Sequence, residues 1–166
     1  MVASRHLHHF GYRTSVLYPK RTSNRLFDNL VSQCIALNIP FVEEKDISEN
    51  NLNNKYDVLL DGIFGFSFRG DNIRSPFDKI MGSMRKCDVP IVSIDVPSGW
   101  HVEKGDIHNI GLSPEILISL TAPKLCAKKF NGKRHFLGGR FVPPGIVKKY
   151  NLVLPDYPGV EQVVEL

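Results

Sequence analysis

The stretch DVLLDGIFGFSFRGD, residues 57–71, decides the fold. Its residues Val58–Asp61 read as a short buried strand that ends in a carboxylate, and Gly62, Gly65 and Gly70 then space out a loop. A continuous apolar run bounded by turn residues is typical of a parallel strand covered on both faces. The loop would lie at the carboxyl end of that strand, where open α/β sheets bind their ligands.

The pattern IDVPSGW, residues 94–100, repeats this arrangement of apolar strand, carboxylate and glycine-containing loop. An unpaired carboxylate at the end of a buried strand costs several kcal/mol in desolvation, so Asp61 and Asp95 each need a partner. We therefore expect the two carboxylates to flank one crevice that the rest of the chain builds.

Strands and helices are expected to alternate along the chain. Strands are predicted at 12–18, 39–42, 58–61, 91–95, 116–120 and 135–142, the last broken by Gly138-Gly139. Helices are predicted at 2–10, after Ser23, after Pro123 and at 144–150, with a polar helix or loop at 46–54. Another begins at Pro76 with Ser75 as its N-cap. The tail from Leu154 onward is proline-rich and expected on the surface. This alternation predicts an α/β fold with a mainly parallel sheet.

Composition narrows the class of protein. A chain of 166 residues with 42% hydrophobic and 23% charged residues fits one globular domain. The net charge of +4 is mild and the basic residues are scattered, which favours a small anionic ligand and argues against nucleic acid. Three separate cysteines predict neither a disulfide framework nor a zinc site, and fit a reducing compartment. We expect no membrane span and no signal peptide.

The glycine loop resembles a phosphate-binding loop only in part. Residues 65–70 read G-x-x-x-x-G, but Asp71 and Asn72 stand where a P-loop has lysine and Ser/Thr, which argues against ATP hydrolysis. The glycines would still let backbone N–H groups approach a phosphate, with Arg69 as a cation. A plain structural turn explains the same residues equally well.

The carboxylates allow three interpretations. Each could cap loop N–H groups, bind a cation, or act as a general acid or base whose pKa is raised by burial. With Ser98 and backbone carbonyls they form a set of hard oxygen donors, which suits an alkali or alkaline-earth cation better than zinc. Lys124, in TAPK, could reach the same rim and pair with Asp95 or a substrate phosphate, or could be an ordinary surface lysine.

Together these residues resemble the YjeF N-terminal domain family, that of the NAD(P)H-hydrate epimerases, also called apolipoprotein A-I-binding proteins. The resemblance rests on six segments that occur in order along almost the whole chain. They are FGYRTSVLYPKR (10–21), LLDGIFGFSFRGD (59–71), VPIVSIDVPSGW (89–100), VEKGD (102–106), LISLTAPK (117–124) and FLGGRFVPP (136–144).

The resemblance implies a Rossmann-like three-layer αβα sandwich and a homodimer. It also implies an isomerase that interconverts the R and S hydrates of NADH and NADPH (NADHX and NADPHX) in nucleotide repair. The nucleotide-contacting loop maps onto Gly65, Phe66, Ser67, Phe68, Arg69, Gly70 and Asp71. Asp95 matches a substrate contact, and we expect it to transfer the proton, supported by Lys124. Asp61 and Ser98 match side-chain ligands of a potassium ion.

One departure from the family concerns the N-terminus. The family has a loop of the type GPGNNGGDG just before the helix ending in ARHL, and this chain begins after it. We expect a single domain, residues 1–166, that lacks the family's first strand and phosphate loop. A catalytically impaired fragment that binds apolipoprotein or another protein is the alternative. The sequence favours the cytoplasm, with mitochondrial or secreted forms if an upstream leader exists.

Overall fold

The computed structural model describes residues 1–69 and 72–166 as an α/β fold with mainly parallel strands. The strands are β1 (Val16–Leu17), β2 (Phe41–Val42), β3 (Leu59–Asp61), β4 (Ile91–Ile94), β5 (Ile116–Leu120), β6 (Arg134–Gly138) and β7 (Val163–Glu165). The helices are α1 (Val2–His9), α2 (Arg25–Ala36), α3 (Glu49–Lys55), α4 (Phe77–Lys86) and α5 (Pro144–Tyr150). Two short 3₁₀ helices span Glu44–Asp46 and Leu125–Lys129.

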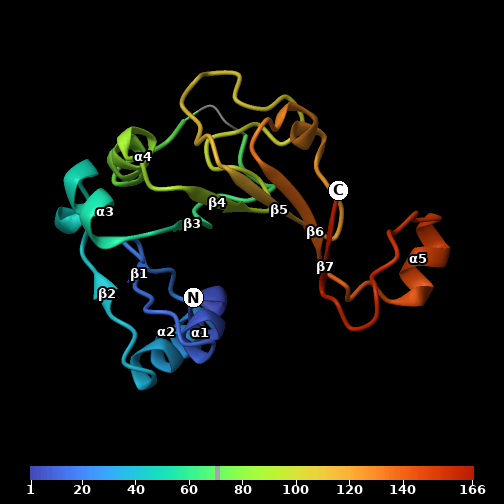
Figure 1. Ribbon diagram of the computed structural model, residues 1–166, viewed down its shortest axis with the longest axis horizontal. Helices are drawn as coiled ribbons and strands as arrows, with labels where there is room; N and C mark the ends of the chain where they lie inside the picture. Colours follow the sequence, from blue (N-terminus) through green and yellow to red (C-terminus); the bar gives the residue numbers. More distant parts are fainter. Residues whose placement is uncertain (70–71) are drawn as a thin grey trace.

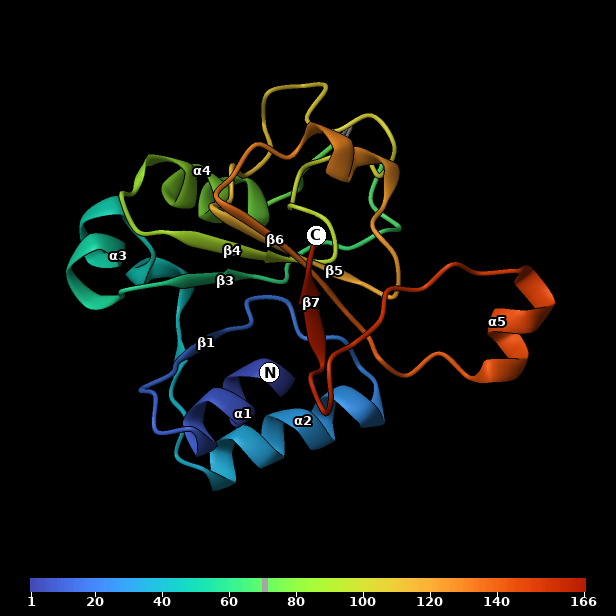
Figure 2. The same ribbon diagram turned by 45° about the vertical axis from the view of Figure 1, so that its right-hand side comes forward.

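The strands form two sheets. β1 and β2 pair in parallel, and a separate sheet has the order β3-β4-β5-β6-β7, parallel from β3 to β6 and antiparallel between β6 and β7. Helices α3 and α4 lie on one side of the five-stranded sheet, and helices α1 and α2 lie on the other (Figures 1 and 2). This layering confirms the predicted αβα architecture.

The main apolar core lies between α4 and the sheet. Helix α4 buries one stripe of its surface, and the members of this core are Leu52, Ile80, Met81, Met84, Ile91 and Leu112. The spacing of Ile80, Met81 and Met84 places them on one helical face, as the sequence predicted. A second cluster joins Val16 and Cys34 of β1 and α2. These cores fix the strands whose carboxyl ends carry the polar residues described below.

One helix start agrees with the prediction and one differs from it. Helix α2 begins at Arg25 and is capped by Asn24, whose side chain accepts a hydrogen bond from Leu26 N at 2.8 Å. Helix α4 begins at Phe77, so Pro76 occupies the cap position and Ser75 does not cap the helix. The reason is a turn in which Phe77 N donates to Arg74 O at 3.0 Å, which delays the helix by one residue.

The C-terminal region holds a strand that the sequence did not predict. β7 pairs with β6, and Arg134 makes two hydrogen bonds to the carboxylate of Glu165, at 2.9 and 2.8 Å. β6 itself ends at Gly138, at the break that the sequence predicted at Gly138-Gly139, and Gly139 has a positive φ of 96°. Between them, α5 projects from the body and buries none of its residues (Figure 2).

Candidate functional site

Asp61, the last residue of β3, is fully buried at 0% exposure. Its Oδ2 accepts hydrogen bonds from Ser93 Oγ at 2.7 Å and from Ser98 N at 2.8 Å. Its Oδ1 accepts from Ser98 Oγ at 2.5 Å and from Ile63 N at 3.3 Å. Ser98 Oγ in turn accepts from Phe64 N at 3.0 Å. The carboxylate therefore ties the loop after β3 to the loop after β4.

This geometry corrects the expected crevice. Asp61 does not line an open crevice with Asp95, because its exposure is 0% and protein donors surround both of its oxygens. It lies beneath the two loops instead. The capping interpretation explains its hydrogen bonds fully.

Burial raises the pKa of Asp61, and the hydrogen bonds from Ser98 and Ser93 oppose that rise. Among residues 1–69 and 72–166, no cationic side chain pairs with this buried carboxylate. Taking a charge out of water without a counter-ion is costly, so a cation bound close by would relieve the penalty. Asp61 and Ser98 supply hard oxygen donors of the type that alkali and alkaline-earth ions prefer. The residues thus fit such an ion in their chemistry.

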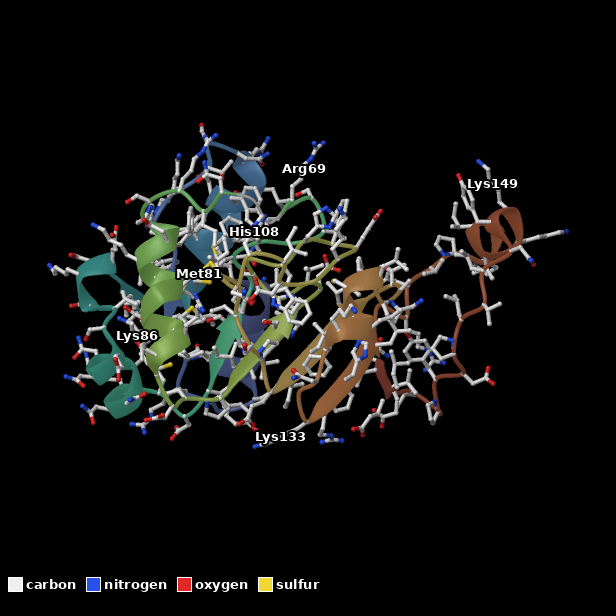
Figure 3. The ribbon with its side chains drawn as sticks, turned by 90° about the horizontal axis from the view of Figure 1, so that it is seen from above. Arg69, Met81, Lys86, His108, Lys133 and Lys149 are labelled. Atoms are coloured by element: carbon white, nitrogen blue, oxygen red, sulfur yellow. The ribbon has the colours of Figure 1, made fainter. Side chains whose placement is uncertain are left out.

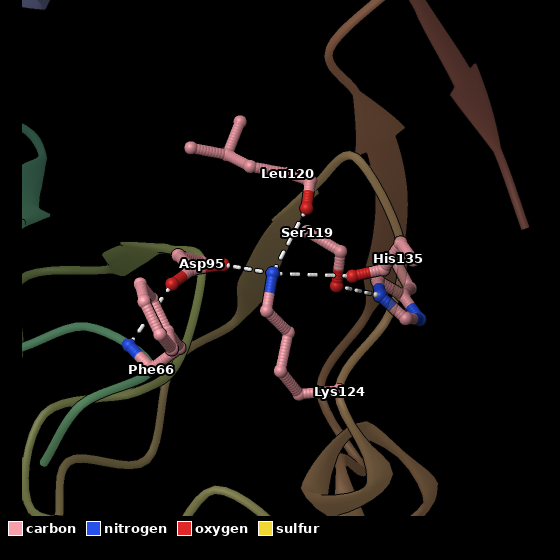
Figure 4. A network of polar contacts seen from close by, with 7 residues as sticks. Phe66, Asp95, Ser119, Leu120, Lys124 and His135 are labelled. Atoms are coloured by element: carbon pink, nitrogen blue, oxygen red, sulfur yellow. Dashed lines mark hydrogen bonds and ion pairs between the residues drawn. The ribbon is translucent and has the colours of Figure 1, made fainter. Parts of the chain in front are cut away.

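Asp95 follows β4 and is held from two sides (Figure 4). Its Oδ1 lies 2.5 Å from the Lys124 ammonium, and its Oδ2 accepts a hydrogen bond from Phe66 N at 3.1 Å. The side chains of Lys124 and Asp95 are 22% and 14% exposed, so the ion pair is largely shielded but reachable. Of the two predicted roles of Lys124, the pairing with Asp95 is observed.

The backbone at Asp95 is strained. Its φ is +73°, and Val96 N donates to Ile94 O at 3.0 Å across it, which makes a classic γ-turn. A non-glycine residue in such a conformation costs about 1–3 kcal/mol and persists where the surroundings enforce it, often at active sites. Here the turn places the carboxylate at the carboxyl end of the parallel sheet.

The glycine loop packs directly against Asp95. A Cβ atom on Gly65 would lie 3.3 Å from Asp95 Oδ2, closer than ordinary contact, which explains why glycine suits this position. Phe68 stacks on Phe64 with 4.4 Å between ring centroids, whereas Phe66 is 67% exposed. Ser67 and Arg69 are exposed, and Arg69 projects from the surface (Figure 3). The predicted contacts Gly70 and Asp71 lie outside the described residues.

Sequence reasoning missed Ser93 and the pair formed by Ser119 and His135. Ser93 is fully buried on β4, where it donates to Asp61. The sequence feature that could have indicated Ser93 is a hydroxyl side chain in the otherwise apolar strand IVSI, at a position on the buried face of that strand. Ser119 Oγ lies 2.9 Å from His135 Nε2, between β5 and β6. Two surface hollows of about 500 and 310 Å³ lie elsewhere, beside Lys79 and beside Cys87.

We expect His135 to make the stability of the fold depend on pH. Burial lowers its pKa from 6.5. The unfolded chain therefore takes up this proton more readily, so the contribution of His135 to stability is present above pH 6.5 and is lost as pH falls through the folded pKa. We expect urea unfolding between pH ~7 and ~5 to show this loss, and His135→Gln to lack it. His108→Gln, at an exposed position, is the control; an unchanged pH slope in His135→Gln would contradict the assignment.

Comparison with known proteins gives a family and two curated relatives. Residues 1–126 match the family model described as YjeF-related protein N-terminus. The chain is 49% identical over 166 residues to the NAD(P)H-hydrate epimerase of Puccinia graminis f. sp. tritici, covering 100% of this chain and 67% of that protein. It is 49% identical over 176 residues to the chloroplastic pyridoxine/pyridoxamine 5'-phosphate oxidase 1 of Arabidopsis thaliana, and spans 33% of that longer protein.

A solved structure has the same fold. The crystal structure of yeast ynu0, YNL200c, superposes with a TM-score of 0.91 at 35% sequence identity, covering 99% of this chain and 70% of that chain. Among the described residues, no helix combines the length and the apolar character needed to cross a bilayer.

Proposed function

Since the chain belongs to the family of YjeF-related protein N-termini, we propose that it is an NAD(P)H-hydrate epimerase, an isomerase that interconverts the R and S hydrates of NADH and NADPH. The observation that carries this proposal is the 49% identity, over the full length of the chain, to a protein of that name. The polar residues at the carboxyl end of the sheet support it, because open α/β sheets bind ligands there.

The reaction inverts a carbon that carries a hydroxyl group and is bonded to a ring nitrogen. Either the hydroxyl leaves and returns, or the bond to the ring nitrogen opens and closes, and both routes require a proton to move to or from the hydroxyl oxygen. In this proposal Asp95 transfers that proton and the Lys124 ammonium supports its charge, 2.5 Å away. No oxidant or reductant is needed.

The glycine loop is proposed to bind the nucleotide. Its residues Gly65 to Arg69 lie beside Asp95, through the close approach of Gly65 and the hydrogen bond from Phe66 N. The exposed Arg69 supplies a cation for a phosphate, and the exposed ring of Phe66 offers a surface for stacking. Gly70 and Asp71 stay in the proposed set on the resemblance alone.

Asp61 and Ser98 are proposed to hold a potassium ion. When bound, the ion would balance the buried charge of Asp61 and so stabilise the two loops that this carboxylate joins. The argument for it is the fully buried carboxylate, whose pKa is raised by burial.

The potassium proposal predicts an ion-specific gain in thermal stability. At constant ionic strength, replacing choline chloride by KCl should raise the Tm of the protein because the ion binds the folded state only. Asp61→Asn should abolish the gain, while Asp57→Asn, an exposed change four residues away, should keep it. Differential scanning fluorimetry measures this. Equal gains in the protein and in Asp61→Asn would place the potassium effect elsewhere.

A homodimer and a protein-binding role are proposed from the C-terminal region. Phe141, Val153 and Val160 are 71%, 97% and 87% exposed, and a partner chain that covers them would remove their apolar surface from water. Light scattering of the purified chain tests the dimer, and direct binding to purified apolipoprotein A-I tests the second role. The three free cysteines favour a reducing compartment such as the cytoplasm, which localisation of the tagged protein can check.

A further inference from the structure

Thr121, the residue after β5, lies in a backbone conformation that β-branched residues avoid. Its φ is +68°, and Ala122 N donates to Leu120 O across it at 2.8 Å, which makes a second classic γ-turn. Thr121 N donates to Gly138 O at 2.9 Å and so anchors the turn to β6. This turn follows the strand that neighbours β4, where Asp95 forms the first.

The turn directs two carbonyl groups at one point. Leu120 and Ala122 flank Thr121, and their carbonyl oxygens accept hydrogen bonds from Lys124 Nζ at 2.9 and 3.3 Å (Figure 4). Asp95 Oδ1 is the third oxygen around the same ammonium, at 2.5 Å. The two carbonyl groups accept hydrogen bonds from the ammonium, and Asp95 Oδ1 meets it as the partner of an ion pair.

The ion pair links Lys124 to the candidate site. The ammonium acts on the site through Asp95, its ion-pair partner. Asp95 is held in turn by Phe66 N on its other oxygen, so its carboxylate has a fixed orientation. The orientation of Asp95 thus depends on where the two carbonyl groups hold Lys124.

We propose that Thr121 is a positioning residue whose turn aims the carbonyl oxygens of Leu120 and Ala122, so that these and Asp95 Oδ1 form a three-oxygen cradle for one monovalent cation. Its native occupant is the Lys124 ammonium. The effect of Thr121 on catalysis rests on the proposed epimerase function, whereas the cradle itself can be tested without activity.

Removing the Lys124 side chain empties the cradle and so tests it. In Lys124→Ala we expect ammonium chloride, compared with choline chloride at equal ionic strength, to raise the Tm by about 2 °C or more beyond any gain in the unsubstituted protein. The rate of R/S interconversion should fall in Lys124→Ala and recover roughly fivefold or more with ammonium. Lys79 lies on the surface of α4. The control variant Lys79→Ala should therefore show neither the rise in Tm nor the change in rate. A folded Lys124→Ala that gains no extra stability from ammonium would overturn the cradle.

The turn is tested at Thr121 itself. Glycine adopts a positive φ readily, so Thr121→Gly should keep the turn. We therefore expect ammonium still to stabilise the double variant Thr121→Gly with Lys124→Ala. Thr121→Pro fixes φ near −65° and removes the N–H that Gly138 O accepts, so the ammonium effect should vanish. Asn38→Ala strains a residue of φ 56° at the end of α2 and controls for lost stability alone.

Two outcomes would overturn the role of Thr121. The first is a folded double variant, Thr121→Pro with Lys124→Ala, whose Tm still rises with ammonium. The second is a Thr121→Gly variant that loses interconversion as fully as Lys124→Ala does, which would assign the effect to the threonine hydroxyl. If Thr121→Pro does not fold, Thr121→Gly decides the case. A chain without any interconversion would instead contradict the proposed function, and the Tm measurement would still judge the cradle.

Discussion

Replacing Asp95 by Asn should lower kcat/KM for interconversion of the R and S hydrates by about 10²–10⁴-fold, the usual contribution of a proton-transferring side chain. The amide is close in shape to the carboxylate but cannot take up or release the proton. It also loses the charge that holds Lys124 at 2.5 Å. Following both epimers by chromatography or NMR measures the rate directly.

The control for this variant is Asp57→Asn, which removes the same charge from an exposed position in the same stretch of sequence. It should leave the rate near that of the unsubstituted protein. An Asp95→Asn variant that is folded and interconverts the epimers at the normal rate would remove Asp95 from the mechanism.

Replacing Asp61 by Asn should lower the free energy of unfolding by about 2–3 kcal/mol. Both carboxylate oxygens accept from backbone N–H groups, Oδ1 from Ile63 and Oδ2 from Ser98. Whichever way the new amide turns, its NH₂ group faces a backbone N–H, and two donors confront each other in a fully buried site. Urea unfolding monitored by fluorescence of the single tryptophan, Trp100, measures the loss.

Ser93→Ala is the matched comparison for this buried network. It removes one donor to Asp61 and leaves the other three, so we expect a loss of about 1 kcal/mol. If Asp61→Asn proves no less stable than Ser93→Ala, Asp61 does not hold the two loops together.

The elements that sequence predicted well are those with strong local patterns. The apolar run before Asp61, the strand before Asp95 and the stripe of α4 all appear in the structure within about a residue or two of their predicted bounds. β7 escaped prediction because it is three residues long and lies in a proline-rich tail. Its stability comes from pairing with β6 and from Glu165 on Arg134, neither of which is visible in the local sequence.

Part of the candidate site could likewise be predicted from the sequence, and part could not. Position at the end of a strand pointed to Asp61 and Asp95, and the loops after those strands and after the strand at 116–120 pointed to the glycine loop, Ser98 and Lys124; the resemblance added their roles. What could not be predicted was which partner each carboxylate takes, since Asp61 is satisfied by serine and backbone donors and Asp95 by Lys124 and Phe66 N. The positive φ at Thr121 was also out of reach, because a β-branched residue is the last one expected there.

The central claim is that the residues around Asp95 epimerise NAD(P)H hydrates, and one measurement tests it most directly. Purified S-hydrate of NADPH is incubated with the 166-residue chain in KCl, and appearance of the R epimer is followed beside Asp95→Asn and a blank without protein. The account predicts approach to the epimer equilibrium well above the blank and a near-blank rate for Asp95→Asn. A folded chain that leaves the epimer ratio at the blank rate would contradict it.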